Sequence, residues 1–185
     1  MNSMTATTAE PLGAAVPRAP TLGGRVRRLL FGVPPRETDL DRRGFRVDSA
    51  AARARFTTVV ESFLAGYHGA IEEPEPARLA ARLTTLDAEC RGFAFEGAGM
   101  GLGMLDAISL SGGRRLRRFL DGPGDPHEYM IYVGVGWAIA RLGGWQRRLD
   151  RLPPMRRHLA ADGLGFHEAF FRTAATVDAQ AEPRR

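Results

Sequence analysis

The chain has 185 residues, of which 44% are hydrophobic and 25% are charged, and its net charge is +5 at pH 7. This composition is typical of a globular domain, and the length leaves little room for a second domain. The positive charge is modest and forms no dense basic stripe, which excludes a typical nucleic-acid-binding protein.

The sequence contains no motif that indicates a metal site, a cofactor or a membrane span. The single cysteine, Cys90, excludes an intrachain disulfide and a cysteine-based metal site. The H-E-x-x-H and E-x-x-H spacings of metal sites do not occur, so we expect neither metal nor cofactor. The longest apolar run, 129–140, is shorter than the roughly 20 residues of a membrane-spanning helix, and no signal peptide is recognisable. We therefore expect a cytoplasmic protein with no membrane partner.

Helical periodicity dominates the first half of the chain. Residues 1–22 are small and proline-punctuated, which predicts a disordered tail. Residues 24–35 predict a short basic helix that docks on its own domain. Asp48 is expected to cap a longer helix, whose apolar side chains recur every three or four residues: Phe56, Val59, Val60, Phe63, Leu64, Tyr67 and Ile71. A second stripe predicts a helix over 76–86.

The second half continues the helical pattern. It predicts a short basic helix within 111–126, an apolar segment over 128–142, an arginine-rich link over 144–157, and a last helix over 162–177. Residues 178–185 are expected to fray. Because no alternating β-branched runs occur, the fold class is mostly α, with a single helical domain over 23–177.

The stretch "RGFAFEGAGMGLGMLD", residues 91–106, has a glycine at every second position from Gly97 to Gly103. A phosphate-binding loop of the Walker type needs a lysine, and the chain has none. A dinucleotide-binding loop needs a third glycine where Met104 stands. The remaining interpretation is a helix whose glycines, four residues apart, allow close approach to another element or to a ligand. Residues 134–140 have the same small-residue texture, so we expect the two helices to cross.

Three polar side chains within apolar segments are candidate catalytic groups. Glu96 stands between Phe95 and Gly97, where burial would raise the pKa of its carboxyl group, although a place at the rim is an equal alternative. His167 follows Phe166 and is either a core histidine or a proton-transfer group. Tyr132 lies in the apolar segment 128–142.

The basic run at Arg114, Arg115, Arg117 and Arg118 has two interpretations. Most such runs are solvated helix faces. The functional alternative is a surface for an acidic protein partner or a phosphorylated carrier, because arginine pairs with carboxylates and phosphates in a bidentate manner.

Three motifs, "RGFAFEGAGMGLGMLD", "YMIYVGVGWAIARL" and "DGLGFHEAFF", resemble the UnbL-type enediyne biosynthesis proteins, over residues from about Arg25 to Thr173. The resemblance implies an accessory role in building or tailoring an enediyne or related polyketide, and it assigns no catalytic residues. Members of that family continue into a second half that echoes the first. A half-length member would leave its glycine-rich faces uncovered, so we expect pairing with a second copy or with a separately encoded second half.

Two functional hypotheses follow. In the first, a pocket lined by aromatic and apolar side chains binds a long conjugated polyketide chain, with Glu96, His167 and Tyr132 as proton-handling groups of a cyclase or isomerase; its predicted lining is Phe93, Met100, Tyr132, Trp137 and Phe166. In the second, the protein is a scaffold or chaperone that docks on an acyl carrier domain through its arginines and shields a reactive intermediate.

Overall fold

The computed structural model describes residues 19–109 and 114–181. Most of the predicted disordered tail, residues 1–18, and the end of the predicted frayed segment, residues 182–185, lie outside these ranges. The described residues form only helices, turns and irregular segments, which confirms the mostly α fold class.

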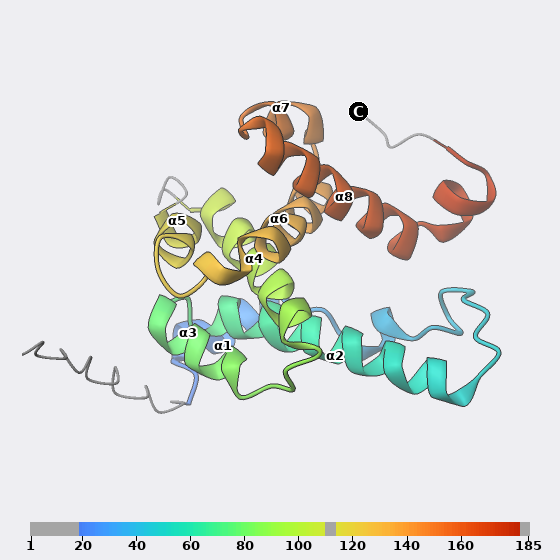
Figure 1. The fold of residues 1–185 in the computed structure, drawn as a ribbon, viewed down its shortest axis with the longest axis horizontal. Helices are drawn as coiled ribbons and strands as arrows, with labels where there is room; N and C mark the ends of the chain where they lie inside the picture. The colour runs from blue at the N-terminus through green and yellow to red at the C-terminus, as the bar shows by residue number, and fades with distance from the viewer. Residues whose placement is uncertain (1–18, 110–113, 182–185) are drawn as a thin grey trace, which may run out of the picture.

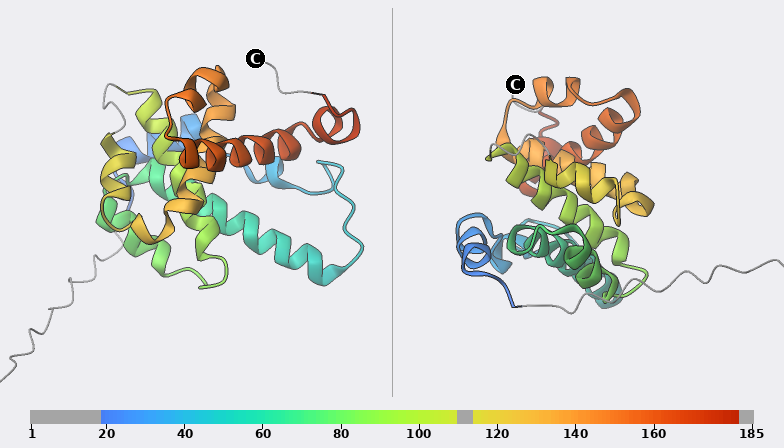
Figure 2. Two further views of the ribbon diagram at one scale, coloured as in Figure 1. Left: turned by 45° about the horizontal axis from the view of Figure 1, so that its top comes forward. Right: turned by 90° about the vertical axis from the view of Figure 1, so that its left-hand side faces the viewer.

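Four long helices make the framework: α2 (Ala50–Glu72), α4 (Arg91–Ala107), α6 (Glu128–Leu142) and α8 (Pro154–Phe171). They are stacked in chain order, and each one packs most extensively against its neighbours in the stack. Figures 1 and 2 show α2 at one side, α4 and α6 crossing in the middle, and α8 at the other side. In Figure 1, α2 and α8 both extend beyond the crossing, toward the right.

Shorter elements connect the long helices. They are α1 (Leu22–Phe31), η1 (Pro35–Thr38), α3 (Pro76–Thr84), α5 (Arg114–Leu120), η2 (Asp125–His127), α7 (Trp145–Asp150) and η3 (Ala174–Asp178). The first of them, α1, packs against α2: Arg27 Nε donates a hydrogen bond to the carbonyl oxygen of Ile71, over 2.6 Å. This confirms that the basic N-terminal helix docks on its own domain. Leu22, Leu29 and Leu30 of α1 nevertheless face solvent.

Several element boundaries differ from those expected. Ser49, and not the expected Asp48, caps α2. Its hydroxyl accepts a hydrogen bond from the Ala52 amide at 3.0 Å. The final long helix begins at Pro154, within the predicted arginine-rich link, and it ends at Phe171. Proline is favoured in the first turn of a helix because that turn's amide groups have no partner within the helix.

The two glycine-rich segments cross, as predicted. A β-carbon on Gly99 of α4 would lie less than 3.0 Å from the carbonyl oxygen of Ile131, and one on Gly134 of α6 would lie even closer to the carbonyl oxygen of Glu96. The two backbones are therefore in direct contact. Each glycine in a helix lowers stability by about 0.5–1 kcal/mol relative to alanine, and close packing of this kind offsets that loss.

The same reciprocal contact occurs at the other two crossings. In both, a β-carbon would overlap a backbone carbonyl oxygen of the opposite helix: Gly66 and Gly97 between α2 and α4, and Gly136 and Gly163 between α6 and α8. The glycine-rich faces are thus covered within this chain. This removes the reason for which we expected pairing, because that expectation rested on uncovered glycine faces.

Candidate functional site

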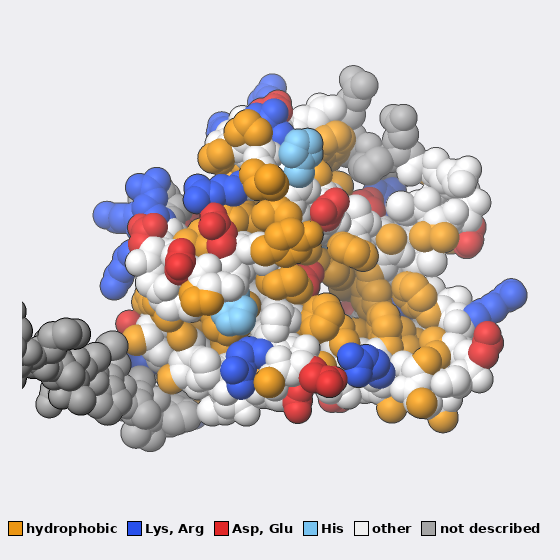
Figure 3. All heavy atoms as spheres, viewed as in Figure 1, with side chains coloured by type: hydrophobic (Ala, Val, Ile, Leu, Met, Phe, Trp, Pro, Cys, Tyr) orange, Lys and Arg blue, Asp and Glu red, His pale blue; other side chains and the backbone are white. Residues whose placement is uncertain are grey.

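A cavity of about 390 Å³ lies between α2 and α8, with α4 and α6 as its floor. Figure 3 shows hydrophobic side chains gathered in this hollow. Apart from Thr38 and Glu96, the residues that line it are hydrophobic. The largest share of the wall comes from α2, through Phe56, Val59, Val60, Phe63 and Leu64. This volume and lining are typical of sites that bind small apolar molecules.

Four of the predicted lining residues do line the cavity: Phe93, Met100, Trp137 and Phe166. Phe166 lies at the rim, with 62% of its surface exposed. Trp137 lies inside and contacts the ring of Phe63, with 4.8 Å between the ring centroids. These four residues therefore lie together in one apolar, aromatic cavity next to the glycine crossing.

Tyr132 does not line this cavity, which corrects the predicted lining. It is five residues from Trp137 on α6, and five residues turn a helix by about 140° relative to the starting face. Tyr132 therefore packs in the hydrophobic cluster of α6, α7 and α8, where the guanidinium of Arg156 lies 5.2 Å from the centre of its ring. Burial raises the pKa of Tyr132.

Among the residues that line the apolar cavity, Glu96 has the only carboxyl group. Its residue is 6% exposed, and its Oε1 accepts a hydrogen bond from Trp137 Nε1 at 2.9 Å. Burial raises the pKa of Glu96 to about 7, and the hydrogen bond from Trp137 acts in the opposite direction. Both the protonated and the ionised forms are therefore populated near neutral pH, as general acid–base catalysis requires.

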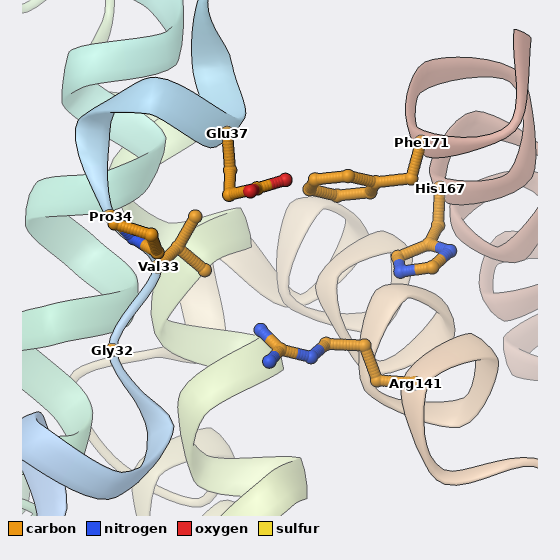
Figure 4. Close-up of a pocket in the computed structure, with 7 residues that line it drawn as sticks. All are labelled: Gly32, Val33, Pro34, Glu37, Arg141, His167 and Phe171. Carbon is orange, nitrogen blue, oxygen red and sulfur yellow. The ribbon is translucent and has the colours of Figure 1, made fainter.

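His167 faces a second, smaller cavity of about 250 Å³. Figure 4 shows this cavity, which is lined by Gly32, Val33, Pro34, Glu37, Arg141, His167 and Phe171. Burial lowers the pKa of His167, while Glu168 acts in the opposite direction, so the imidazole is neutral at pH 7. The structure does not bring His167 into the cavity of Glu96. Trp137 contacts both residues: its Nε1 donates to Glu96, and its ring is in edge contact with His167 at 5.7 Å between centroids.

Arg43 holds the segment between α1 and α2 against α8. Its Nε donates to the carbonyl oxygen of Glu37 at 2.9 Å, and its guanidinium forms an ion pair with the carboxylate of the same Glu37. A further hydrogen bond reaches the carbonyl oxygen of Phe171, over 3.2 Å, and the guanidinium lies 4.6 Å from the centre of the Phe171 ring. Arg43 therefore joins the two sides of the cavity entrance.

The residues that the sequence interpretation did not assign to the cavity come from three regions. They are the α2 stripe, assigned to the core, the segment before α2 with Val33, Thr38 and Phe45, and the C-terminal residues Ala169, Phe170, Phe171 and Val177. The length of the apolar stripe on α2 was the one available signal: it begins at Phe56, whose ring lies 6.4 Å from that of Phe170 on α8.

The basic run lies on α5, away from both cavities. Arg114, Arg117 and Arg118 are exposed and form no ion pair with any described residue. Arg115 instead pairs with Asp106, at 3.2 Å, and Asp106 also accepts a hydrogen bond from the Leu116 amide at 2.9 Å. Asp106 therefore has a structural role at the start of α5.

The described residues provide neither a metal cluster nor a membrane-spanning helix. They contain no group of three or more His, Cys, Asp or Glu side chains arranged to hold a metal ion. Nor does any helix among them combine the length and hydrophobicity needed to cross a bilayer.

The fold and the site define an all-α protein with glycine-mediated helix crossings and an apolar cavity that contains one buried carboxyl group. The family model described as "Protein of unknown function (DUF1702)" matches residues 22–185, and the chain belongs to this family. No curated protein and no solved structure gives a significant match.

Proposed function

We propose that this protein is an accessory protein of enediyne or related polyketide biosynthesis that binds a long conjugated polyketide chain. The observation that carries the proposal is the apolar cavity of about 390 Å³ with one buried carboxyl group. Conjugated chains are flat and apolar, and aromatic walls with few polar groups suit them. The class of pathway rests on the resemblance of the three motifs to UnbL-type proteins.

Glu96 would supply the chemistry of a cyclisation or isomerisation. Its protonated carboxyl group donates a proton to one carbon of the conjugated chain, and the resulting carboxylate accepts a proton from another carbon. Double bonds move without net oxidation or reduction, and Glu96 returns to its starting form. Since His167 and Tyr132 lie outside this cavity, the catalytic part of the proposal depends on Glu96.

Binding is tested with a neutral fluorescent polyene, the methyl ester of cis-parinaric acid. We expect saturable fluorescence enhancement with the unchanged protein and its loss in Ala169→Trp, because Ala169 lines the cavity and a large side chain fills it. Ala77→Trp, at an exposed position of α3, is the matched control and should bind normally. Equal binding by both variants would contradict the proposed cavity.

Catalysis is tested separately, in a reaction with the neighbouring polyketide synthase. Glu96→Gln keeps an acceptor for Trp137 but does not titrate, so polyene binding is expected to persist while product formation stops. Unchanged product formation in this variant would remove the catalytic role and leave the binding role.

A scaffold that docks on an acyl carrier domain is the second candidate function. The observation that favours it is the exposed, unpaired set of Arg114, Arg117 and Arg118 on one short helix. Carrier binding would then weaken as salt increases, and the triple glutamine variant would lose it. Glu96→Gln and His167→Gln would leave carrier binding and product formation unchanged.

Pairing with a second copy or with a separately encoded second half remains part of the proposal. The glycine faces do not provide the surface, since the chain itself covers them. Light scattering at micromolar concentration, alone and with the candidate second half, tests the point. A monomer under both conditions would count against pairing.

A further inference from the structure

The smaller cavity contains a cation, Arg141, that forms no ion pair with any residue that the structure describes. Arg141 is the penultimate residue of α6, and its exposed side chain points into this cavity in Figure 4. It forms no ion pair and no hydrogen bond with any described residue. An arginine that lines a concave site and has no protein partner is available to bind an anionic group from a ligand.

The other charged group in this cavity does not cancel Arg141. Glu37 also lines the cavity, but its carboxylate is paired with Arg43, and Arg36 lies 3.8 Å from its other oxygen. The cavity therefore has a net positive charge, contributed by Arg141.

His167 places a second polar side chain at the same cavity. The residue is 8% exposed, and its buried Nδ1 has no well-aligned hydrogen bond, the nearest acceptor being Glu168 Oε1 at 3.4 Å. In Figure 4 the ring edge points toward the space that Arg141 also faces. Because Nδ1 is buried beside Glu168, a ligand in this space would meet the opposite edge of the imidazole together with the guanidinium of Arg141.

The two cavities adjoin each other. Val33 and Phe171 line both of them, so the small polar cavity opens beside the large apolar one. A single molecule with a hydrocarbon chain and a polar end matches this arrangement, because one cavity is hydrophobic apart from Thr38 and Glu96 and the other contains the cation Arg141.

We propose that the two cavities form one bipartite site, in which the apolar cavity holds the chain of the ligand and Arg141 binds a carboxylate at its end. This inference rests on the proposed binding of an apolar chain and specifies its class as a long-chain carboxylic acid. A single planar guanidinium matches a carboxylate through two parallel hydrogen bonds. A phosphate would also be attracted to Arg141, and the test includes it as a separate outcome.

The test compares cis-parinaric acid with its methyl ester at pH 8, by fluorescence titration. The two probes have the same chain and differ in the charge at the end. We expect the protein to bind the acid more tightly than the ester, and Arg141→Gln to weaken acid binding by about tenfold or more while leaving ester binding unchanged. Arg141→Lys keeps the charge without the planar fork and should give intermediate affinity.

Arg147→Gln is the matched control, since Arg147 is another exposed arginine with no ion pair or hydrogen bond to any described residue, and it lies on α7 outside both cavities. It should leave both affinities unchanged. Thermal unfolding of each variant checks the fold, and Arg141→Gln should unfold like the parent because Arg141 makes no hydrogen bond or ion pair with any described residue.

Three results would overturn the inference. Equal affinity for acid and ester, unaffected by Arg141→Gln, would leave the apolar cavity as a binding site but remove Arg141 from it. Absence of binding by both probes would overturn the proposed function and this inference together. Competition by phosphopantetheine, with none by a short-chain carboxylate such as octanoate, would assign Arg141 to a carrier phosphate instead.

Discussion

The backbone carbonyl oxygen of Glu96 packs directly against the Cα of Gly134, and the side chain of the same Glu96 accepts a hydrogen bond from Trp137, three residues further along α6. One crossing of two helices therefore fixes both the backbone contact and the polar pair in the cavity. Because the contact leaves no room for a β-carbon, the position of the carboxyl group depends on the glycine.

Gly134→Ala should destabilise the protein by about 3 kcal/mol, since the added β-carbon would lie less than 3.0 Å from the Glu96 carbonyl oxygen and α4 and α6 would have to separate. Urea unfolding measures the change. Gly165→Ala is the control in α8, where a β-carbon meets nothing within 4 Å, and it should stabilise by about 0.5–1 kcal/mol. A similar effect in both variants would show that the helices do not cross as described.

Much of this packing could be predicted from the sequence. Glycines four residues apart lie on one side of a helix, and two such segments in one chain indicate a close crossing. The spacing of Tyr132 and Trp137 also predicts their faces: five residues apart on a helix, the two side chains point in different directions, so they do not line the same cavity. The spacing of two residues on a helix predicts which face they share, whereas their aromatic character does not.

The rest of the site depends on tertiary structure that the sequence pattern does not reveal. His167 and Arg141 share a cavity because the irregular segment before α2 folds over them, and this segment has no periodicity from which its path could be predicted. Similarly, Ser49 and Asp48 are both good helix caps and adjacent in the chain. Only the position of the Ala52 amide shows which one caps α2.

Glu96→Gln should flatten the dependence of stability on pH. The pKa of Glu96, about 7, lies above its ordinary value of 4.5, so the folded state binds the proton more tightly than the unfolded chain. The protonated Glu96 carboxyl group therefore stabilises the folded state fully below pH 4.5, and this stabilisation, about 3 kcal/mol, is lost as the pH rises through 7. Relative to the parent, the variant should thus gain stability between pH 5 and pH 8, measured by urea unfolding. A constant difference across this range would show that Glu96 ionises normally.

Trp137→Phe should raise the pKa of Glu96 above about 7, because the indole N–H that stabilises the carboxylate is removed while an aromatic ring remains. Carbon-13 NMR of labelled glutamate carboxyl groups measures this pKa, and Glu96→Gln identifies the signal. Trp145→Phe, which changes the other tryptophan of the chain, should leave it unchanged. A fall in the pKa in Trp137→Phe would mean that water replaces the indole.

Arg43→Met should loosen the cavity entrance, since it removes the hydrogen bonds to Glu37 and Phe171 that join the segment before α2 to α8. We expect faster amide hydrogen exchange over residues 33–48 and weaker binding of the polyene ester. Arg36→Gln, which removes a more exposed and longer ion pair to Glu37, should have little effect. If the two variants behave alike, Arg43 does not secure the entrance.

The stacking order of the long helices has a consequence for the size of the binding site. The facing walls of the large cavity belong to α2 and α8, the first and last helices of the stack, and each is positioned through the three successive crossings. Small angular adjustments at these inner crossings add together and are greatest at the outer ends. Related chains could therefore accommodate ligands of different girth by changing residues far from the bound molecule, with every wall residue conserved.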